Sequence, residues 1–412
     1  MNLFKIKQQY LKMTSKISIS KIVIILLHLS LFFMFFSPYS LSLFFLVFLS
    51  LIGFASFLSK VTFSLKVKKD IFYFLIFIIL MHMLGLYSEW GNEYLPIYNT
   101  IGKVMLIIIS SATVLFMKYD NGISGFIGKL SFLFILTLFV CTVINILFPL
   151  PLYLGQDYRG GDWFRLTGIY SEPGMLANVC VFFLSIFIAA EKDKQQRIKA
   201  LFVSFFVISF STSAFGLFAF LLLCLYCTGL ERSFYLKMVF CLIILISILA
   251  FFTNYTERGS IMFDMIHEIF TYNGLSSYKN TQDGSFWLKL SNMECTFQRS
   301  YSDMILGEGI YGNSRQTYQN FRIDGRVDYS EGCAWVNSNG AIILWVYQYG
   351  LPVVAFFLMF LIKNLKVSSL LIFIVMLSRS GENPIFICLV SFIFSLLIYN
   401  EQNNKKQPSI TL

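Results

Sequence analysis

Long apolar runs, separated by short polar segments, dominate this chain. A helix of about 20 apolar residues crosses a bilayer core that is roughly 30 Å thick. Runs near this length recur along most of the sequence, and some occur as closely spaced pairs of shorter runs. We predict an all-α, polytopic integral membrane protein with about 12 membrane segments, at 22–37, 39–58, 71–87, 102–117, 130–148, 174–190, 198–210, 213–228, 238–253, 339–362, 367–378 and 384–399.

Two of the predicted pairs are short. The pair within 198–228 is broken at 211–213, and the pair within 367–399 is broken at 379–384. Each pair is either two short spans or a re-entrant pair, and both alternatives return the chain to the same side of the membrane. A single long helix in either place would invert the topology of everything after it.

The composition supports the same fold class. Hydrophobic residues make up 57% of the 412 residues and charged residues 13%, whereas soluble domains have roughly 45–50% and about 25%. So few charges do not cover a water-facing surface. A soluble enzyme, a disordered protein, a coiled coil and a small disulfide scaffold are therefore excluded.

The net charge is +10, and the positions of the cations are more informative than their sum. Lys and Arg in short loops favour the cytoplasmic side. With the Lys-rich N-terminus inside, alternation places 21 of the 32 Lys and Arg, but only 6 of the 22 acids, in cytoplasmic segments. We therefore predict that both termini are cytoplasmic.

Two sizeable loops fall on the opposite, outer side. The predicted organisation is a cytoplasmic N-terminus at 1–21, helices 1–5 at 22–148, a first outer loop at 149–173, segments 6–9 at 174–253, a long outer loop at 254–338, segments 10–12 at 339–399 and a cytoplasmic tail at 400–412. The long loop carries 7 Lys and Arg but 10 acids, so no footprint for nucleic acid exists there.

The first outer loop holds Arg159 and Arg165 and leads into the helix predicted from 174. Arg binds phosphate oxygens through a planar fork of N–H donors. Glu172 precedes Pro173, which suits the start of a helix, so the carboxylate is expected at the positive end of the helix dipole. Two interpretations stay open: a capped, solvated turn, or a membrane-surface site in which Glu172 orients or deprotonates a hydroxyl.

The long outer loop, about 85 residues, is too long for a plain connector. It contains candidate groups for a substrate in Arg258, Arg299 and His267, and it ends near Asn337 and Asn339. Aromatic faces with amides and acids at their edges suit sugar rings. A solvated outer loop without a site has a similar composition, so this alternative stays open.

A further Arg and Glu, Arg379 and Glu382, interrupt the apolar run 367–399. Charges between two hydrophobic halves are costly unless they line a cavity or pair with each other. They form either an ion-paired outer turn or part of a lipid-facing pocket.

Cysteine and histidine do not suggest a metal centre. Six of the eight Cys lie in apolar runs as small core residues, while Cys295 and Cys333 lie in the long loop, where their pairing stays open. His28 and His82 lie in apolar runs, where a hydrogen-bonded core imidazole is expected. We expect no metal and no other cofactor.

Four motifs occur in a distinctive order. They read Arg-Leu-Thr-Gly-Ile-Tyr-Ser-Glu-Pro-Gly-Met-Leu-Ala at 165–177, Ser-Phe-Ser-Thr-Ser at 209–213, Leu-Gly-Glu-Gly-Ile-Tyr-Gly at 306–312 and Asn-Ser-Asn-Gly-Ala-Ile-Ile-Leu-Trp-Val-Tyr-Gln-Tyr-Gly-Leu at 337–351. Together with the two outer loops, this order resembles bacterial O-antigen and exopolysaccharide polymerases of the Wzy type, within the O-antigen polymerase and ligase superfamily.

The resemblance implies a metal-independent glycosyltransferase at the periplasmic face of the inner membrane. Its donor and acceptor would be polyprenyl-diphosphate-linked oligosaccharide repeats, and the growing chain would be transferred to a hydroxyl of a new lipid-linked repeat. Arg159 and Arg165 would bind diphosphate, with Arg299 or Arg379 opposite them. Glu172 would orient Arg165 or act as the base, His267 is the alternative base, and Asn337 and Asn339 would bind sugar. A chain-length regulator and a flippase are partners left open.

The chain departs from the family pattern at two places. Thr212 and Ser213 stand where the family often has an Arg, and Asn337 stands where the related O-antigen ligases have a His. The missing His favours polymerase over ligase but leaves the general base open. A lipid-linked oligosaccharide flippase is the alternative from another class; a transporter of this kind would place charges in mid-span.

Overall fold

The computed structural model describes residues 19–33, 123–148, 166–170, 172–211, 213–228, 297, 301–307 and 340–377, together with 386, 389, 390, 392–394 and 396–398. Within these residues, all regular secondary structure is helical. The first group of helices is α2 (Ile19–Phe32), α6 (Ile123–Leu147), α7 (Pro173–Ala190), α8 (Lys194–Ser211) and α9 (Ala214–Thr228). The second is α13 (Tyr301–Leu306), α15 (Ala341–Tyr349), α16 (Leu351–Leu365), the 3-10 turn η3 (Lys366–Ser368) and α17 (Ser369–Met376).

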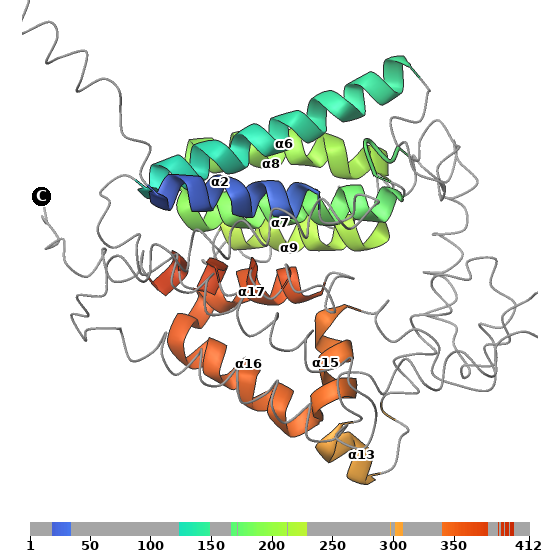
Figure 1. Ribbon diagram of the computed structural model, residues 1–412, viewed down its shortest axis with the longest axis vertical. Helices are drawn as coiled ribbons and strands as arrows, with labels where there is room; N and C mark the ends of the chain where they lie inside the picture. Colours follow the sequence, from blue (N-terminus) through green and yellow to red (C-terminus); the bar gives the residue numbers. More distant parts are fainter. Residues whose placement is uncertain are drawn as a thin grey trace, which may run out of the picture.

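By length and composition, three helical stretches in the described part could cross a membrane: Ser124–Leu147, Pro173–Ala190 and Leu351–Met376. The last is not one straight helix, because the chain turns at η3 between α16 and α17 (Figure 1). The described part of the chain is thus compatible with an all-α membrane protein.

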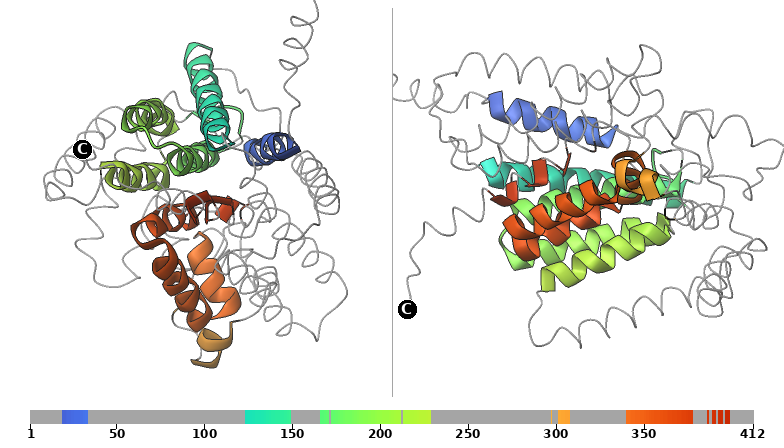
Figure 2. Two further views of the ribbon diagram at one scale, coloured as in Figure 1. Left: turned by 90° about the vertical axis from the view of Figure 1, so that its left-hand side faces the viewer. Right: turned by 90° about the horizontal axis from the view of Figure 1, so that it is seen from below.

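The first group forms a bundle around α7. Its helices lie side by side (Figure 1), and the end-on view in Figure 2 shows α7 among the others. Every residue of α7 except Gly174 and Met175 is buried, and α7 packs against α6, α8, α9 and α17. A helix that is apolar on all sides is typical of such an enclosed position.

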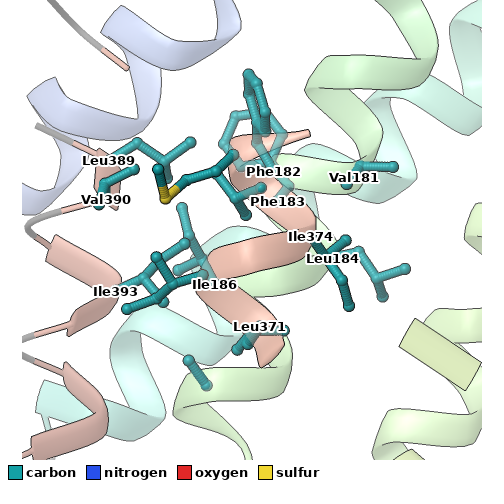
Figure 3. Packing of buried hydrophobic residues seen from close by; sticks show 14 of the residues in the cluster. Val181, Phe182, Phe183, Leu184, Ile186, Leu371, Ile374, Leu389, Val390 and Ile393 are labelled. Atoms are coloured by element: carbon teal, nitrogen blue, oxygen red, sulfur yellow. The ribbon is translucent and has the colours of Figure 1, made fainter. Parts of the chain in front are cut away.

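One side of α7 packs against the C-terminal part of the chain. Figure 3 shows Phe182 and Ile186 of α7 in an apolar cluster with Ile374 of α17 and with Ile393. The rings of Phe182 and Phe386 have centroids 6.1 Å apart. The C-terminal helices therefore share a core with the bundle.

A buried polar contact joins α2 to α6. His28 Nδ1 lies 2.8 Å from the carbonyl oxygen of Ile24, and Nε2 lies 2.9 Å from Ser131 Oγ. A carbonyl oxygen only accepts, so Nδ1 carries the proton and the neutral ring accepts from the Ser131 hydroxyl. The interpretation of His28 as a satisfied core histidine is confirmed.

α8 and α9 form a helical hairpin. α8 ends at Ser211 and α9 begins at Ala214. The rings of Phe205 and Phe220, on opposite arms, have centroids 5.6 Å apart. A single long helix through 198–228 is therefore excluded, and the predicted break is confirmed.

The predicted segment 339–362 is divided in the structure. α15 ends at Tyr349 and α16 begins at Leu351, and Figure 1 shows the two helices inclined to each other. The break lies at Gly350, which has φ 86°, and is followed by Pro352. Positive φ ends the first helix, and Pro suits the first turn of the second because it lacks an N–H. Hydropathy alone did not reveal this bend.

The bundle has two chemically different ends. At one end, Ser124 Oγ donates to the carbonyl of Ala190 at 2.9 Å, and Arg197 Nε donates to the carbonyl of Glu191 at 2.7 Å. Figure 1 shows the turn between α16 and α17 at this same end. All Lys and Arg among the described residues lie here: Lys21, Lys129, Lys192, Lys194, Arg197, Lys199, Lys363 and Lys366. We call this the basic end; Glu172 lies at the opposite end.

Candidate functional site

At the end opposite the basic end, residues 166–170 form an anchored turn that leads into α7. The backbone N–H of Leu166 donates to the carbonyl of Phe210, in the last turn of α8, at 3.0 Å. The N–H of Tyr170 donates to the carbonyl of Thr167 at 3.1 Å and closes the turn. Leu166 and Thr167 are buried. Backbone bonds and burial at both ends therefore fix this turn against the bundle.

Gly168 at the centre of the turn has φ 58°. Residues with a Cβ rarely adopt this left-handed conformation. A Cβ at this position would also lie 3.3 Å from Leu176 Cδ1, one turn into α7. The backbone conformation therefore favours glycine here, and the space beside Leu176 is tight.

Tyr170 ties the turn to the first described helix. Its side chain is fully buried, and its hydroxyl donates to the carbonyl oxygen of Phe32, at the end of α2, over 2.8 Å. Burial raises the pKa of Tyr170 well above its usual range, so the hydroxyl stays protonated and keeps donating.

Glu172 is the N-cap residue of α7. Its backbone is extended, with φ −132° and ψ 142°, and its carbonyl accepts from the N–H of Met175 at 3.1 Å. The carboxylate makes no capping hydrogen bond to the helix, and the residue is half-buried. The backbone of Glu172 therefore starts the helix without a capping bond from its side chain. A carboxylate here is also stabilised by the positive end of the helix dipole.

The C-terminal end of the 165–177 motif, at Ala177, packs tightly against α9. A Cβ added at Gly216 would lie 2.6 Å from the Cβ of Ala177 and 3.2 Å from Ile208 Cγ2. The N–H of Gly216 donates to Ser213 Oγ at 3.2 Å, so Ser213 caps the start of α9. Small residues at 177 and 216 thus allow α7 and α9 to approach each other at this end of the bundle.

A second contact lies between the residue after α13 and the break between α15 and α16. Gly307 follows α13 with φ 73°, and a Cβ there would lie 2.7 Å from the backbone nitrogen of Gly350. A Cβ at Gly350 would in turn overlap the carbonyl of Ile305. The 306–312 and 337–351 motifs therefore meet at one backbone contact.

A scan against protein-family models finds no match for this chain, and a search of the curated proteins finds none either.

Of the predicted site residues, Glu172 is described by the structure. The others lie outside the described residues: Arg159, Arg165, Arg258, His267, Arg299, Asn337, Asn339, Arg379 and Glu382. The structure adds residues that sequence reasoning did not select, namely Tyr170, Ala177 and Gly216 as supports of the segment around Glu172. A polar hydroxyl next to an apolar run was the only sequence signal that Tyr170 needs a hydrogen-bond partner. The sequence did not indicate that this partner is the carbonyl of Phe32 on α2.

Proposed function

We propose that this chain is a polymerase of lipid-linked O-antigen repeats at the periplasmic face of the bacterial inner membrane. The observation that carries the proposal is the construction of the 166–177 segment. The stretch that resembles the polymerase motif is anchored to α2, α8 and α9 by Tyr170, Leu166 and Ala177, and it presents Glu172 at the start of α7. Catalytic groups are best held by rigid elements of this kind.

The proposed topology has about 12 membrane segments, with both termini cytoplasmic and the long loops periplasmic. The gathering of the described cations at the basic end supports this orientation, because Lys and Arg favour the cytoplasmic side. Glu172 then lies on the periplasmic side, where lipid-linked repeats would be joined.

The proposed reaction forms one glycosidic bond and breaks one bond to phosphate. A hydroxyl oxygen of the acceptor repeat attacks the anomeric carbon of the growing chain, and the bond from that carbon to the polyprenyl diphosphate breaks. The hydroxyl proton passes to a base, and the diphosphate leaves with its electron pair. An enzyme accelerates this step by stabilising the departing charge and by orienting the acceptor oxygen.

Each candidate residue has a role in this scheme. Glu172 orients Arg165 or accepts the proton, and His267 is the alternative base. Arg165 binds diphosphate in this scheme, and in the sequence it directly precedes Leu166, whose N–H donates to the carbonyl of Phe210. The remaining substrate-binding candidates are Arg159, Arg258, Arg299, Arg379, Glu382, Asn337 and Asn339.

The test is the lipopolysaccharide ladder of a deletion strain complemented with the wild type, Arg165→Ala or Arg165→Lys. We expect the deletion and Arg165→Ala to leave core plus a single repeat, with the variant inserted at wild-type level. Arg165→Lys keeps the charge but loses the fork, so we expect long chains to be largely lost as well. A normal ladder from Arg165→Ala would contradict the assignment of that residue.

The deletion also separates the alternatives. An O-antigen ligase deletion leaves bare core with no repeats, and a flippase deletion accumulates lipid-linked repeats on the cytoplasmic side. Either result would replace the polymerase assignment.

A further inference from the structure

α6 and α8 are parallel neighbours, and their outer faces carry side chains of the same types in the same order: a Lys near the basic end, then exposed apolar residues. Both helices begin at the basic end, on either side of α7 (Figures 1 and 2). They touch through Phe139 and Phe206, whose ring centroids lie 5.0 Å apart. Lys129 lies ten residues before Phe139, and Lys199 seven residues before Phe206, so both Lys lie two to three turns from this contact toward the basic end.

Each Lys is followed by exposed apolar side chains on the same helix face. On α6, Leu133 lies four residues after Lys129 and is 57% exposed, and Val140 is 51% exposed. On α8, Phe202 lies three residues after Lys199 and is 76% exposed. Spacings of three, four and eleven residues place side chains on one side of a helix. We call these five residues the α6–α8 face.

Two acids among the described residues, Glu191 and Asp193, lie in the turn near this face. Glu191 Oε1 accepts from the backbone N–H groups of Lys192 and Asp193 at 2.9 and 3.0 Å. Asp193 Oδ1 accepts from the N–H of Gln195 at 2.9 Å. One oxygen of each carboxylate therefore serves the turn between α7 and α8, while Glu191 Oε2 lies near Gly128 of α6. Within 191–199 four cations outnumber these two acids, so the surface here keeps a net positive charge. Neither Lys129 nor Lys199 has an ion pair or hydrogen bond in the described structure, and both are exposed.

We propose that the α6–α8 face binds one anionic phospholipid. Its phosphate lies between Lys129 and Lys199, and its acyl chains lie along Leu133, Val140 and Phe202. Charge complementarity selects the occupant, because cations at the membrane surface attract anionic headgroups more than zwitterionic ones. The order of Lys and apolar residues matches the order of headgroup and acyl chain, with the Lys stems lying along the apolar face. This site is at the end opposite Glu172 and does not depend on the proposed polymerase activity.

The test is native mass spectrometry of the full-length protein in detergent with equimolar dioleoyl phosphatidylglycerol and dioleoyl phosphatidylcholine. We expect the wild type to retain one phosphatidylglycerol in preference to phosphatidylcholine. In the variant Lys129→Gln with Lys199→Gln, we expect this preference to fall about tenfold. The control is Lys363→Gln with Lys366→Gln, which removes the same charge from the end of α16 and keeps the preference.

Two outcomes would overturn the proposal. Equal retention of both lipids by the wild type would show that the α6–α8 face does not select charge. An equal loss in the α16 control would show that general charge at the basic end, rather than this face, attracts the lipid. Size-exclusion profiles identical to that of the wild type show that both variants are folded.

Discussion

The hydroxyl of Tyr170 donates to the carbonyl oxygen of Phe32, 2.8 Å away, and so joins the turn before α7 to the end of α2. The two residues are 138 positions apart in the chain. The bond links the turn before α7 to the first described helix, and the side chain of Tyr170 is fully buried. Buried bonds of this kind fix one arrangement, because breaking them leaves a polar group without water.

Replacement of Tyr170 by Phe tests this link. The ring stays, but the hydrogen bond is lost, so we expect the protein to lose about 1 kcal/mol of stability, measured as a lower midpoint of thermal unfolding in detergent. Tyr226→Phe, on a half-buried Tyr of α9, is the control and should leave the midpoint unchanged. Equal midpoints for Tyr170→Phe and the wild type would mean that the bond contributes nothing.

The contact between α7 and α9 gives a second prediction. In Gly216→Ala the new Cβ would lie 2.6 Å from the Cβ of Ala177, so we expect about 1–3 kcal/mol of destabilisation from overpacking. Gly125→Ala in α6 is the matched control, because nothing lies within 4 Å of its added Cβ. Adding Ala177→Gly to Gly216→Ala should restore part of the lost stability; failure of this rescue would argue against the contact.

Gly350 gives a third prediction. Gly350→Ala introduces a Cβ at positive φ and against the carbonyl of Ile305, a backbone atom that does not move aside as a side chain does. We expect a larger loss of folded protein than for Gly216→Ala, measured as the monodisperse fraction in fluorescence-detected size-exclusion chromatography. Gly174→Ala, with open space at its Cβ, should behave as wild type. A milder effect at Gly350 than at Gly216 would contradict this ranking.

The buried bond between His28 and Ser131 gives a fourth prediction. Ser131→Ala leaves His28 Nε2 buried without its partner, so we expect a loss of about 1–3 kcal/mol. The double variant His28→Leu with Ser131→Ala removes both polar groups and should be less destabilised than the sum of the two single variants. Additive losses in this double-mutant cycle would show that the two side chains do not interact.

The fifth prediction concerns the proposed chemistry. Glu172→Gln keeps the shape of the side chain and removes its charge, so we expect long O-antigen chains to be lost while the protein inserts normally. Asp193→Asn is the control, because it removes one negative charge from the exposed turn at the basic end and keeps an oxygen for the N–H of Gln195. A full ladder from Glu172→Gln would exclude Glu172 as base or as partner of Arg165.

The helical class of the described part could be predicted from the apolar runs, and so could the break between α8 and α9. Both follow from local signals: runs long enough for a helix, and small polar residues at 211–213 that interrupt them. The start of α7 at Pro173 was also predictable, because Pro suits the first turn.

The bend at Gly350 and the supports of Glu172 could not be predicted in this way. An isolated Gly in an apolar run is compatible with a continuous helix, and its effect depends on α13 packing against it. The partner of Tyr170 is a backbone carbonyl on another helix, and the partner of Gly216 is an Ala. Carbonyls and small residues occur throughout the chain, so only the packing of α2, α7 and α9 selects them.

The contact between Gly307 and Gly350 has a consequence for how the length of the segment 308–339 can change. The segment 308–339 follows Gly307, which contacts the helix bend at Gly350. It is followed by Gly340, the N-cap residue of α15. Both attachment points are thus fixed by the helices rather than by the segment itself. Doubling the length of a loop between fixed ends costs only about 0.6 kcal/mol. A change in the length of this segment is therefore expected to leave both attachment points, and the helices that carry them, in place.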